Sequence, residues 1–213
     1  AVPVIISGGD PFYQALAVTP AGRAYVAYRH LHTAPPGTNI WLTVMESTGQ
    51  WDASVLAANT FASGVSAGHP SIVINANGTG FIVTEGDGDA GLQNKIYATA
   101  ITGGTWSPTP DSIETESPSI AFGPRVAVTD AGIGVAIWGR RTSAGAPAVV
   151  VYNRFNLGGW GSTGYFSANI ADAGQPEIVA SPGGLFVVAW PAYFSNRSGL
   201  YSVWSTNSGL GWT

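Results

Sequence analysis

The sequence has no cysteine, few charged residues and no long apolar run. Because none of the 213 residues is cysteine, disulfides, thiolate metal sites and cysteine nucleophiles are excluded. Charged residues make up 9% of the chain, against a usual share of about 25%. With only eight basic residues and a net charge of −4, the chain lacks the basic face that nucleic-acid binding needs. We therefore expect no nucleic-acid partner. No apolar run approaches the roughly 18 residues of a membrane span, so we expect no membrane-spanning segment.

Apolar and turn-forming residues are abundant instead. The chain is 45% hydrophobic, with eight each of Trp, Tyr and Phe, which excludes disorder and supplies a core. It begins at Ala1 without Met, as a secreted protein does after signal-peptide removal, although a segment of a longer chain would begin in the same way. We therefore expect an extracellular or cell-surface location.

Glycine and tryptophan recur with one period along the chain. The glycines that follow the first apolar run of each unit are 56, 54 and 52 residues apart, and the tryptophans that follow the third run are 55, 54 and 52 apart. These markers are Gly22, Gly78, Gly132 and Gly184, and Trp51, Trp106, Trp160 and Trp212. Such self-similarity indicates four repeats of about 54 residues each.

Each repeat is predicted to contain four strands and no helix. Runs of Val, Ile, Tyr and Thr alternate with Gly, Pro, Asn and Asp turns, and no stretch shows a sustained 3.6-residue apolar period. Tandem four-stranded units are typical of a β-propeller. We therefore predict one all-β domain over 1–213, a four-bladed propeller with blades at about 8–60, 61–115, 116–168, and 169–213 together with 1–7.

The ends of the chain suggest how the ring closes. The last repeat stops at Thr213 before its fourth strand, and the strand-like run Ala1–Ser7 precedes the first repeat. An N-terminal strand that completes the last blade would remove an exposed sheet edge. The alternative is a dimer that pools its blades into a larger ring.

A family resemblance follows from these motifs. The repeated pattern Pro-x-hydrophobic-Ala-Val-x-x-x-Gly-x-x-Val-Ala-x-Trp, followed by Gly-Gly-x-Trp, resembles the repeats of secreted bacterial sialidase-like (BNR/Asp-box) propellers. The run Ser205-Thr-Asn207-Ser-Gly209-Leu-Gly-Trp212 is similar to an Asp box with Asn in place of Asp. The resemblance implies architecture and secretion. It implies no activity, because Asp boxes stabilise a turn far from any catalytic centre.

Candidate binding residues lie in the connections between second and third strands, at 29–38, 85–94, 139–147 and 191–198. Variable loops on a rigid repeated scaffold are where binding residues tend to be placed, although each loop is also consistent with a plain solvated tip. The chemistry differs from blade to blade, with His30 and His32, Asp87 and Asp89, Arg140 and Arg141, and Tyr193.

Two charged residues occupy equivalent positions on adjacent inner strands. Arg125 and Glu177 are 52 residues apart at the same point of the repeat, so we expect an ion pair at the pore. This pair either satisfies two partly dehydrated charges or forms a polar floor for a ligand.

Metal binding and catalysis find less support. Asp87 and Asp89 resemble the start of a calcium loop but lack its distal Glu, so a plain acidic turn is favoured, and three histidines without cysteine support a metal site weakly. We expect no cofactor. A sialidase needs an arginine cluster and a tyrosine nucleophile, but the family's first-blade arginine motif is absent, and a carboxylate pair of Glu177 with Glu85 or Asp87 has no fixed separation.

We therefore expect a secreted, non-catalytic module that binds a glycan or another small polar ligand. One alternative is a self-associating structural or adhesive surface protein, because low charge leaves little repulsion between copies. The other is a sialidase-like glycoside hydrolase.

Overall fold

The computed structural model describes residues 11–33, 36–53, 55–58, 67–88, 93–116, 120–166, 172–194 and 197–213. All regular elements in this part of the chain are strands, and they form four antiparallel sheets. The first sheet has the order β1-β2-β3-β4, with β1 (Pro11–Val18), β2 (Ala24–Thr33), β3 (Pro36–Met45) and β4 (Val55–Ala58). The all-β, four-repeat prediction is confirmed.

The second and third sheets repeat this order along the chain, and the described part of the fourth repeats its first three strands. The second contains β5 (Ala67–Ile74), β6 (Gly80–Gly88) and β7 (Gln93–Thr102), with the short β8 (Thr105–Trp106) and β9 (Asp111–Ser112) both paired with β7. The third contains β10 (Ile120–Val128), β11 (Gly134–Arg141) and β12 (Val149–Asn156), with β13 (Gly159–Trp160) and β14 (Gly164–Tyr165) both paired with β12. The fourth contains β15 (Glu177–Ala180), β16 (Phe186–Phe194) and β17 (Arg197–Ser205).

The period-marking glycines form the turns between first and second strands. All four have positive φ angles, between 76° and 99°, which glycine adopts without the Cβ clash of other residues. Each donates its N–H to the carbonyl three residues earlier, as Gly78 does to Asn75 at 3.1 Å. The glycine spacing therefore reports a backbone requirement of the turn.

The connections between second and third strands are shorter than the sequence indicates. Strand pairing continues through Thr33 and Pro36 in the first sheet and through Asp87 and Asn94 in the second. The polar residues expected in loops thus lie on strand ends, because backbone pairing does not depend on side-chain polarity.

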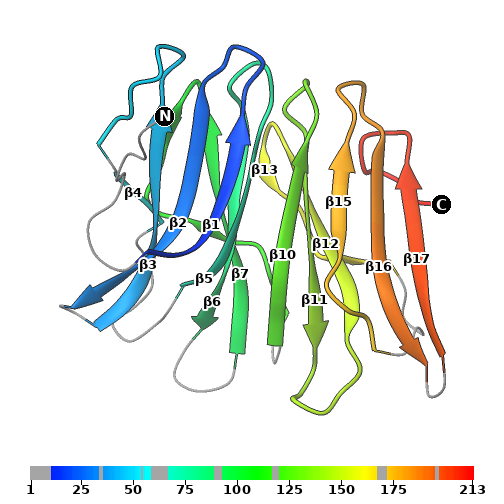
Figure 1. The fold of residues 1–213 in the computed structure, drawn as a ribbon. Helices are drawn as coiled ribbons and strands as arrows, with labels where there is room; N and C mark the ends of the chain where they lie inside the picture. The colour runs from blue at the N-terminus through cyan, green and yellow to red at the C-terminus, as the bar shows by residue number, and fades with distance from the viewer. Residues whose placement is uncertain are drawn as a thin grey trace.

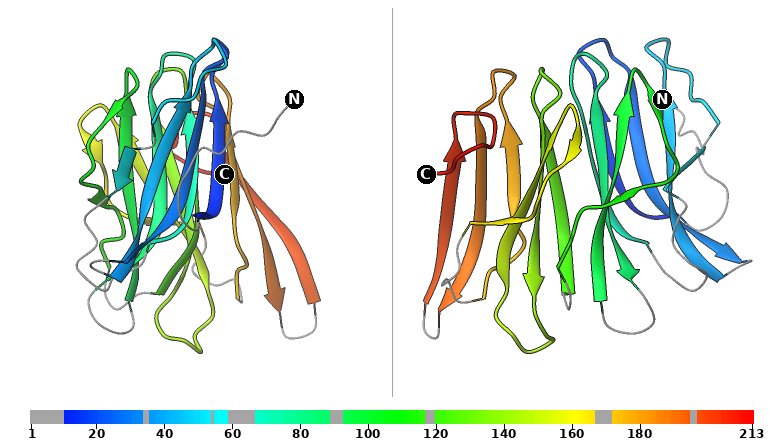
Figure 2. Two further views of the ribbon diagram at one scale, coloured as in Figure 1. Left: turned by 60° about the vertical axis from the view of Figure 1, so that its left-hand side comes forward. Right: turned by 180° about the vertical axis from the view of Figure 1, so that it is seen from behind.

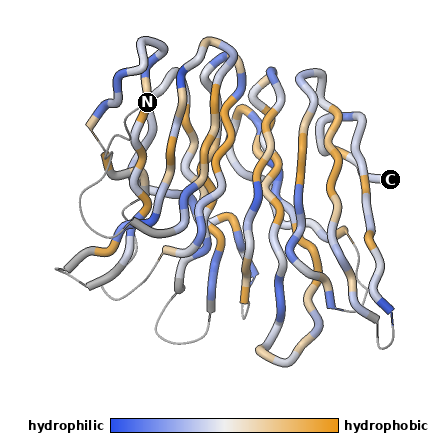
Figure 3. Tube along the Cα trace, in the orientation of Figure 1, coloured by the Kyte–Doolittle hydropathy of each residue, from blue (hydrophilic) through white to orange (hydrophobic). Residues whose placement is uncertain are grey.

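The four sheets stand in a row, with β1 to β4 at one end and β15 to β17 at the other (Figures 1 and 2). Apolar residues follow the strands of all four sheets (Figure 3), and three buried clusters join the first sheet to the second, the second to the third and the third to the fourth. The described residues thus form an open arc. The strand Ala1–Ser7, predicted to complete the last blade, lies outside the described residues.

Three of the four tryptophans that follow the third strands, Trp106, Trp160 and Trp212, pack against these cores. Trp106 packs against the first of the three clusters and Trp212 against the third. The ring of Trp160 lies 5.3 Å from that of Phe81 and 5.4 Å from that of Phe155, centroid to centroid. These side chains therefore join neighbouring sheets.

Candidate functional site

A cavity of about 750 Å³ opens where the first strands of the sheets begin. Its polar and aromatic lining comes from the first three sheets and from the segment just before β15, so residues far apart in the sequence meet there. They are Tyr13, Gln14, His69, Ser71, Glu85, Phe122, Arg125 and Gln175.

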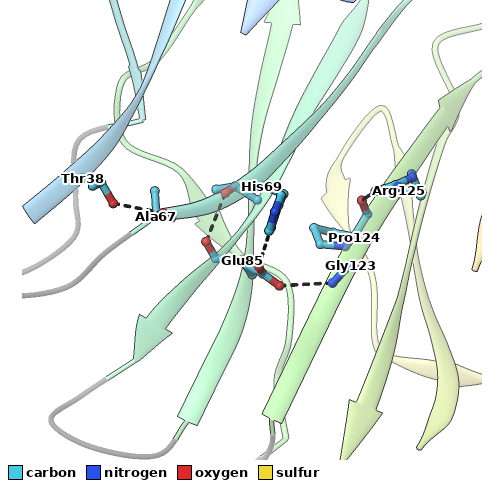
Figure 4. Close-up of polar contacts among 8 residues, drawn as sticks. Thr38, Ala67, His69, Glu85, Gly123, Pro124 and Arg125 are labelled. Carbon is cyan, nitrogen blue, oxygen red and sulfur yellow. Dashed lines mark hydrogen bonds and ion pairs between the residues drawn. The ribbon is translucent and has the colours of Figure 1, made fainter. Parts of the chain in front are cut away.

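Glu85 on β6 connects two sheets at the wall of this cavity (Figure 4). Its Oε1 lies 3.1 Å from Nδ1 of His69, and its Oε2 accepts a hydrogen bond from the N–H of Gly123 at 3.1 Å. The side chain passes over Gly68, where a Cβ atom would lie 2.0 Å from Cγ of Glu85. Glycine at position 68 therefore leaves the room that this carboxylate occupies.

Tyr13 lies against His69 at the opening. Their ring centroids are 3.7 Å apart, and the guanidinium of Arg29 lies 5.8 Å from the tyrosine ring. Tyr13 has a φ of 47°, a strained value for a bulky residue. Its side chain is nevertheless 47% exposed, so the strain presents an aromatic face to solvent. Strain of this kind concentrates at functional sites.

Arg125 and Glu177 form the ion pair that the sequence predicts. Nε of Arg125 donates to Oε1 and Oε2 of Glu177 at 3.0 and 3.1 Å, and Nη1 donates to the carbonyl of Pro124. With its amide oxygen turned toward the guanidinium, Gln175 accepts from Nη1 at 2.9 Å. The guanidinium is thereby held in one orientation at the cavity edge.

Arg140, also expected to bind ligand, lies outside the cavity lining. It forms an ion pair with Glu116 at 2.6 Å and a hydrogen bond with the hydroxyl of Tyr165, which in turn donates to Glu116. The hydrogen bond from Tyr165 lowers the pKa of Glu116 below its usual value, while burial raises the pKa of Tyr165. Arg140 is buried in this cluster, which joins the third sheet to the segment after β9.

Three other candidates do not line the cavity. Arg141 pairs with Asp172 at 3.0 Å and lies 5.5 Å from the ring of Phe122, behind the cavity wall. His30 packs near Trp41, with ring centroids 5.6 Å apart, and Tyr193 is exposed near the end of β16.

The remaining candidates fall where side chains are not described. His32 and Asp87 lie on β2 and β6, and Asp89 lies outside the described residues. In the described ranges, no three His, Asp or Glu side chains are placed to hold a metal ion. Of the predicted binding residues, the cavity thus contains Arg125, with Glu177 attached to it.

Sequence reasoning missed Tyr13, His69 and Gln175 as site residues, although the repeat carries a signal for them. Tyr13, His69 and Gln175 hold the same position in their repeats, and Gly123 holds it in the third repeat. In the last three repeats this position directly precedes a proline, which is Pro70, Pro124 or Pro176. In the first three sheets the strand register shifts at this point. Such β-bulges re-aim side chains, which here turn toward the cavity.

Comparison with known proteins gives a structural likeness. No family model and no curated protein sequence matches the chain. Ulvan lyase, a polysaccharide lyase solved bound to -[GlcA(1-4)Rha3S]-, is similar with a TM-score of 0.66 at 12% identity, over 95% of this chain and 54% of that one. The chain thus spans about half of that enzyme's length.

An endo-arabinase and an α-L-arabinanase are also similar. An endo-arabinase from Bacteroides thetaiotaomicron has a TM-score of 0.55 at 16% identity, over 95% of this chain and 77% of that one. An α-L-arabinanase from Penicillium chrysogenum, complexed with arabinobiose, has a TM-score of 0.58 at 14% identity, over 94% and 63%. This agrees with the architecture that the sialidase-like resemblance implies, while membership of that group stays a prediction.

The described residues contain no helix long and apolar enough to cross a membrane. At identities this low, the likeness to solved structures is evidence of fold alone. The chain folds as a β-propeller of four antiparallel sheets.

Proposed function

We propose that this chain binds an oligosaccharide in the cavity at the start of its first strands. The observation that carries the proposal is one repeat position. At the bulges of the first three sheets it places Tyr13, His69 and Gly123 around one cavity, and Gln175 holds the equivalent position just before β15. Because equivalent positions of the four repeats carry different residues, the repeated scaffold forms an asymmetric polar site.

The lining suits a sugar. The exposed ring of Tyr13 offers an apolar face, while Gln175 and His69 offer hydrogen-bonding groups beside it. A volume of about 750 Å³ lies within the range of small-ligand pockets. Ulvan lyase and the Penicillium arabinanase were both solved with oligosaccharides, which supports this ligand class.

Binding can be measured by affinity electrophoresis and calorimetry against a panel of acidic and neutral polysaccharides. Tyr13→Ala and Gln175→Ala should weaken binding at least tenfold, because each removes a cavity contact. Tyr193→Ala is the matched control, since Tyr193 is 52% exposed and lies away from the cavity lining. No binding to any polysaccharide, or an equal loss for Tyr193→Ala, would contradict the proposal.

A catalytic role is the second candidate, favoured by the contact between His69 and Glu85. A carboxylate 3.1 Å from Nδ1 orients an imidazole, and Tyr13 beside it supplies a second proton-transfer group, as general acid–base chemistry requires. Assays for new reducing ends and for unsaturated sugar products would test it on any polysaccharide that binds. Turnover that His69→Ala abolishes while binding persists would support catalysis; binding without turnover would leave a binding module.

A further inference from the structure

The four sheets pack on one another by a single rule. Alternate residues on the first strand of each later sheet enter a core with the second and third strands of the sheet before it. Ile72 and Ile74 of β5 share a cluster with Ile40 and Leu42 of β3, together with Ala27 of β2.

The next two interfaces follow the same rule. Val126 and Val128 of β10 share a cluster with Val83 of β6 and Ile96 of β7. Ile178 of β15 shares a cluster with residues of β11 and β12, including Val150. Each interface therefore has an inserting row on a first strand and a receiving face on second and third strands.

The first sheet carries an inserting row that nothing in the described structure covers. Leu16 stands at the repeat position of Ile72, Val126 and Ile178, all of which are buried, yet it is 62% exposed. Val18, at the position of Ile74 and Val128, is likewise exposed. An apolar row built like the buried ones thus faces outward on β1.

The fourth sheet carries the matching receiving face. Leu200 stands at the repeat position of Ile40, Ile96 and Val150, all buried, but is 79% exposed. Trp204, at the position of the buried Val44, is also exposed, as is Val179. The first and fourth sheets lie at opposite ends of the row (Figures 1 and 2), so the two faces cannot cover each other within the described arc.

We propose that the inserting row of one copy, Leu16 and Val18, packs on the receiving face of a second copy, Val179, Leu200 and Trp204. The contact would continue the packing that joins the sheets within the chain, with first strand of one copy against third strand of the other. A head-to-tail contact of this kind joins different surfaces on the two partners, and it either closes into a ring or continues as a filament. Because Leu16 also lines the edge of the cavity, the contact is tested by mass in the absence of any saccharide.

The mass of the protein in solution tests the proposal. By light scattering after size-exclusion chromatography, the wild-type chain should have at least twice the 21.9 kDa of one copy at high concentration. Leu16→Asp and Leu200→Asp should each reduce it to that of one copy, because each buries a charge in the contact. Leu157→Asp, at a leucine that is 91% exposed on a turn of the third sheet, is the matched control and should keep the wild-type mass.

Mixing the two variants identifies which faces meet. Leu16→Asp keeps an intact receiving face and Leu200→Asp keeps an intact inserting row, so the mixture should form dimers that grow no further. Circular dichroism confirms that each variant is folded, which is expected because both leucines are exposed. A wild-type chain that stays at the mass of one copy, or a mixture that stays monomeric, would overturn the proposal.

Discussion

The carboxylate of Glu85, on the second sheet, accepts a hydrogen bond from the backbone N–H of Gly123, on the third. The same carboxylate contacts His69, so one side chain joins the bulges of two adjacent sheets. The cavity therefore keeps its shape through a bond between blades, in addition to the apolar cores that lie between them.

Glu85→Ala should lower the free energy of unfolding by about 1.5–3 kcal/mol, the usual contribution of a hydrogen bond to a charged group. Glu46→Ala is the comparison, because Glu46 forms a partly exposed ion pair with Arg23, and such pairs contribute about 0–1 kcal/mol. Urea unfolding of both variants measures the difference. Equal losses would show that the bond between Glu85 and Gly123 adds little stability.

Gly123→Ala should both destabilise the fold and disturb the cavity. Gly123 has a φ of 59°, and a Cβ atom there would lie 2.8 Å from Cγ of Gln175. A left-handed conformation costs a non-glycine residue about 1–2 kcal/mol, and Gln175 must move away. Gly145→Ala, at a glycine with open space around it, should leave the melting temperature nearly unchanged; the same decrease in both variants would contradict this account.

Asn207 should tolerate Asp but not Ala. Its Oδ1 accepts hydrogen bonds from Oγ of Ser205 at 2.8 Å and from the N–H of Gly211 at 2.9 Å, which only an acceptor at that position can satisfy. Asn207→Ala should cost about 1 kcal/mol or more, whereas Asn207→Asp keeps the acceptor. Thermal unfolding compares them, and equal melting temperatures for the two variants would exclude a role for the side chain in this turn.

Acid should weaken the cluster of Glu116, Tyr165 and Arg140. The hydrogen bond from Tyr165 lowers the pKa of Glu116 below its ordinary value. The stabilising effect of this carboxylate is therefore complete above that ordinary pKa and is lost as pH falls through the lower, folded-state pKa. Wild-type stability should therefore decrease more steeply in acid than that of Glu116→Gln. Tyr165→Phe, which removes the donor, should reduce the steepness in the same way; identical acid profiles for all three proteins would contradict the linkage.

The repeat, its strands and the pair of Arg125 with Glu177 could all be predicted from the sequence. Turn glycines such as Gly78 and Gly132 mark where the chain must adopt a positive φ, and this requirement recurs once in every blade. Arg125 and Glu177 hold equivalent repeat positions, so adjacent blades bring them together. These features depend on local backbone conformation and on a fixed period, both of which can be read along the chain.

The cavity could not be predicted in this way. A register shift next to Pro70 directs His69 toward it, and an irregularity of one residue leaves no apolar periodicity to recognise. Arg140 was expected at the site, but it pairs with Glu116. The partner of an arginine depends on which carboxylate the fold brings nearest to it.

The amino-acid sequence by itself thus determined the four-blade period, the strand order and the turns, since each repeat specifies its own backbone. Only the tertiary structure decided which polar side chains share a cavity and which apolar rows stay uncovered. Leu16 and Ile72 hold the same position of the repeat. Ile72 is buried because the first sheet packs against its strand, whereas Leu16 is exposed because none of the described sheets precedes β1.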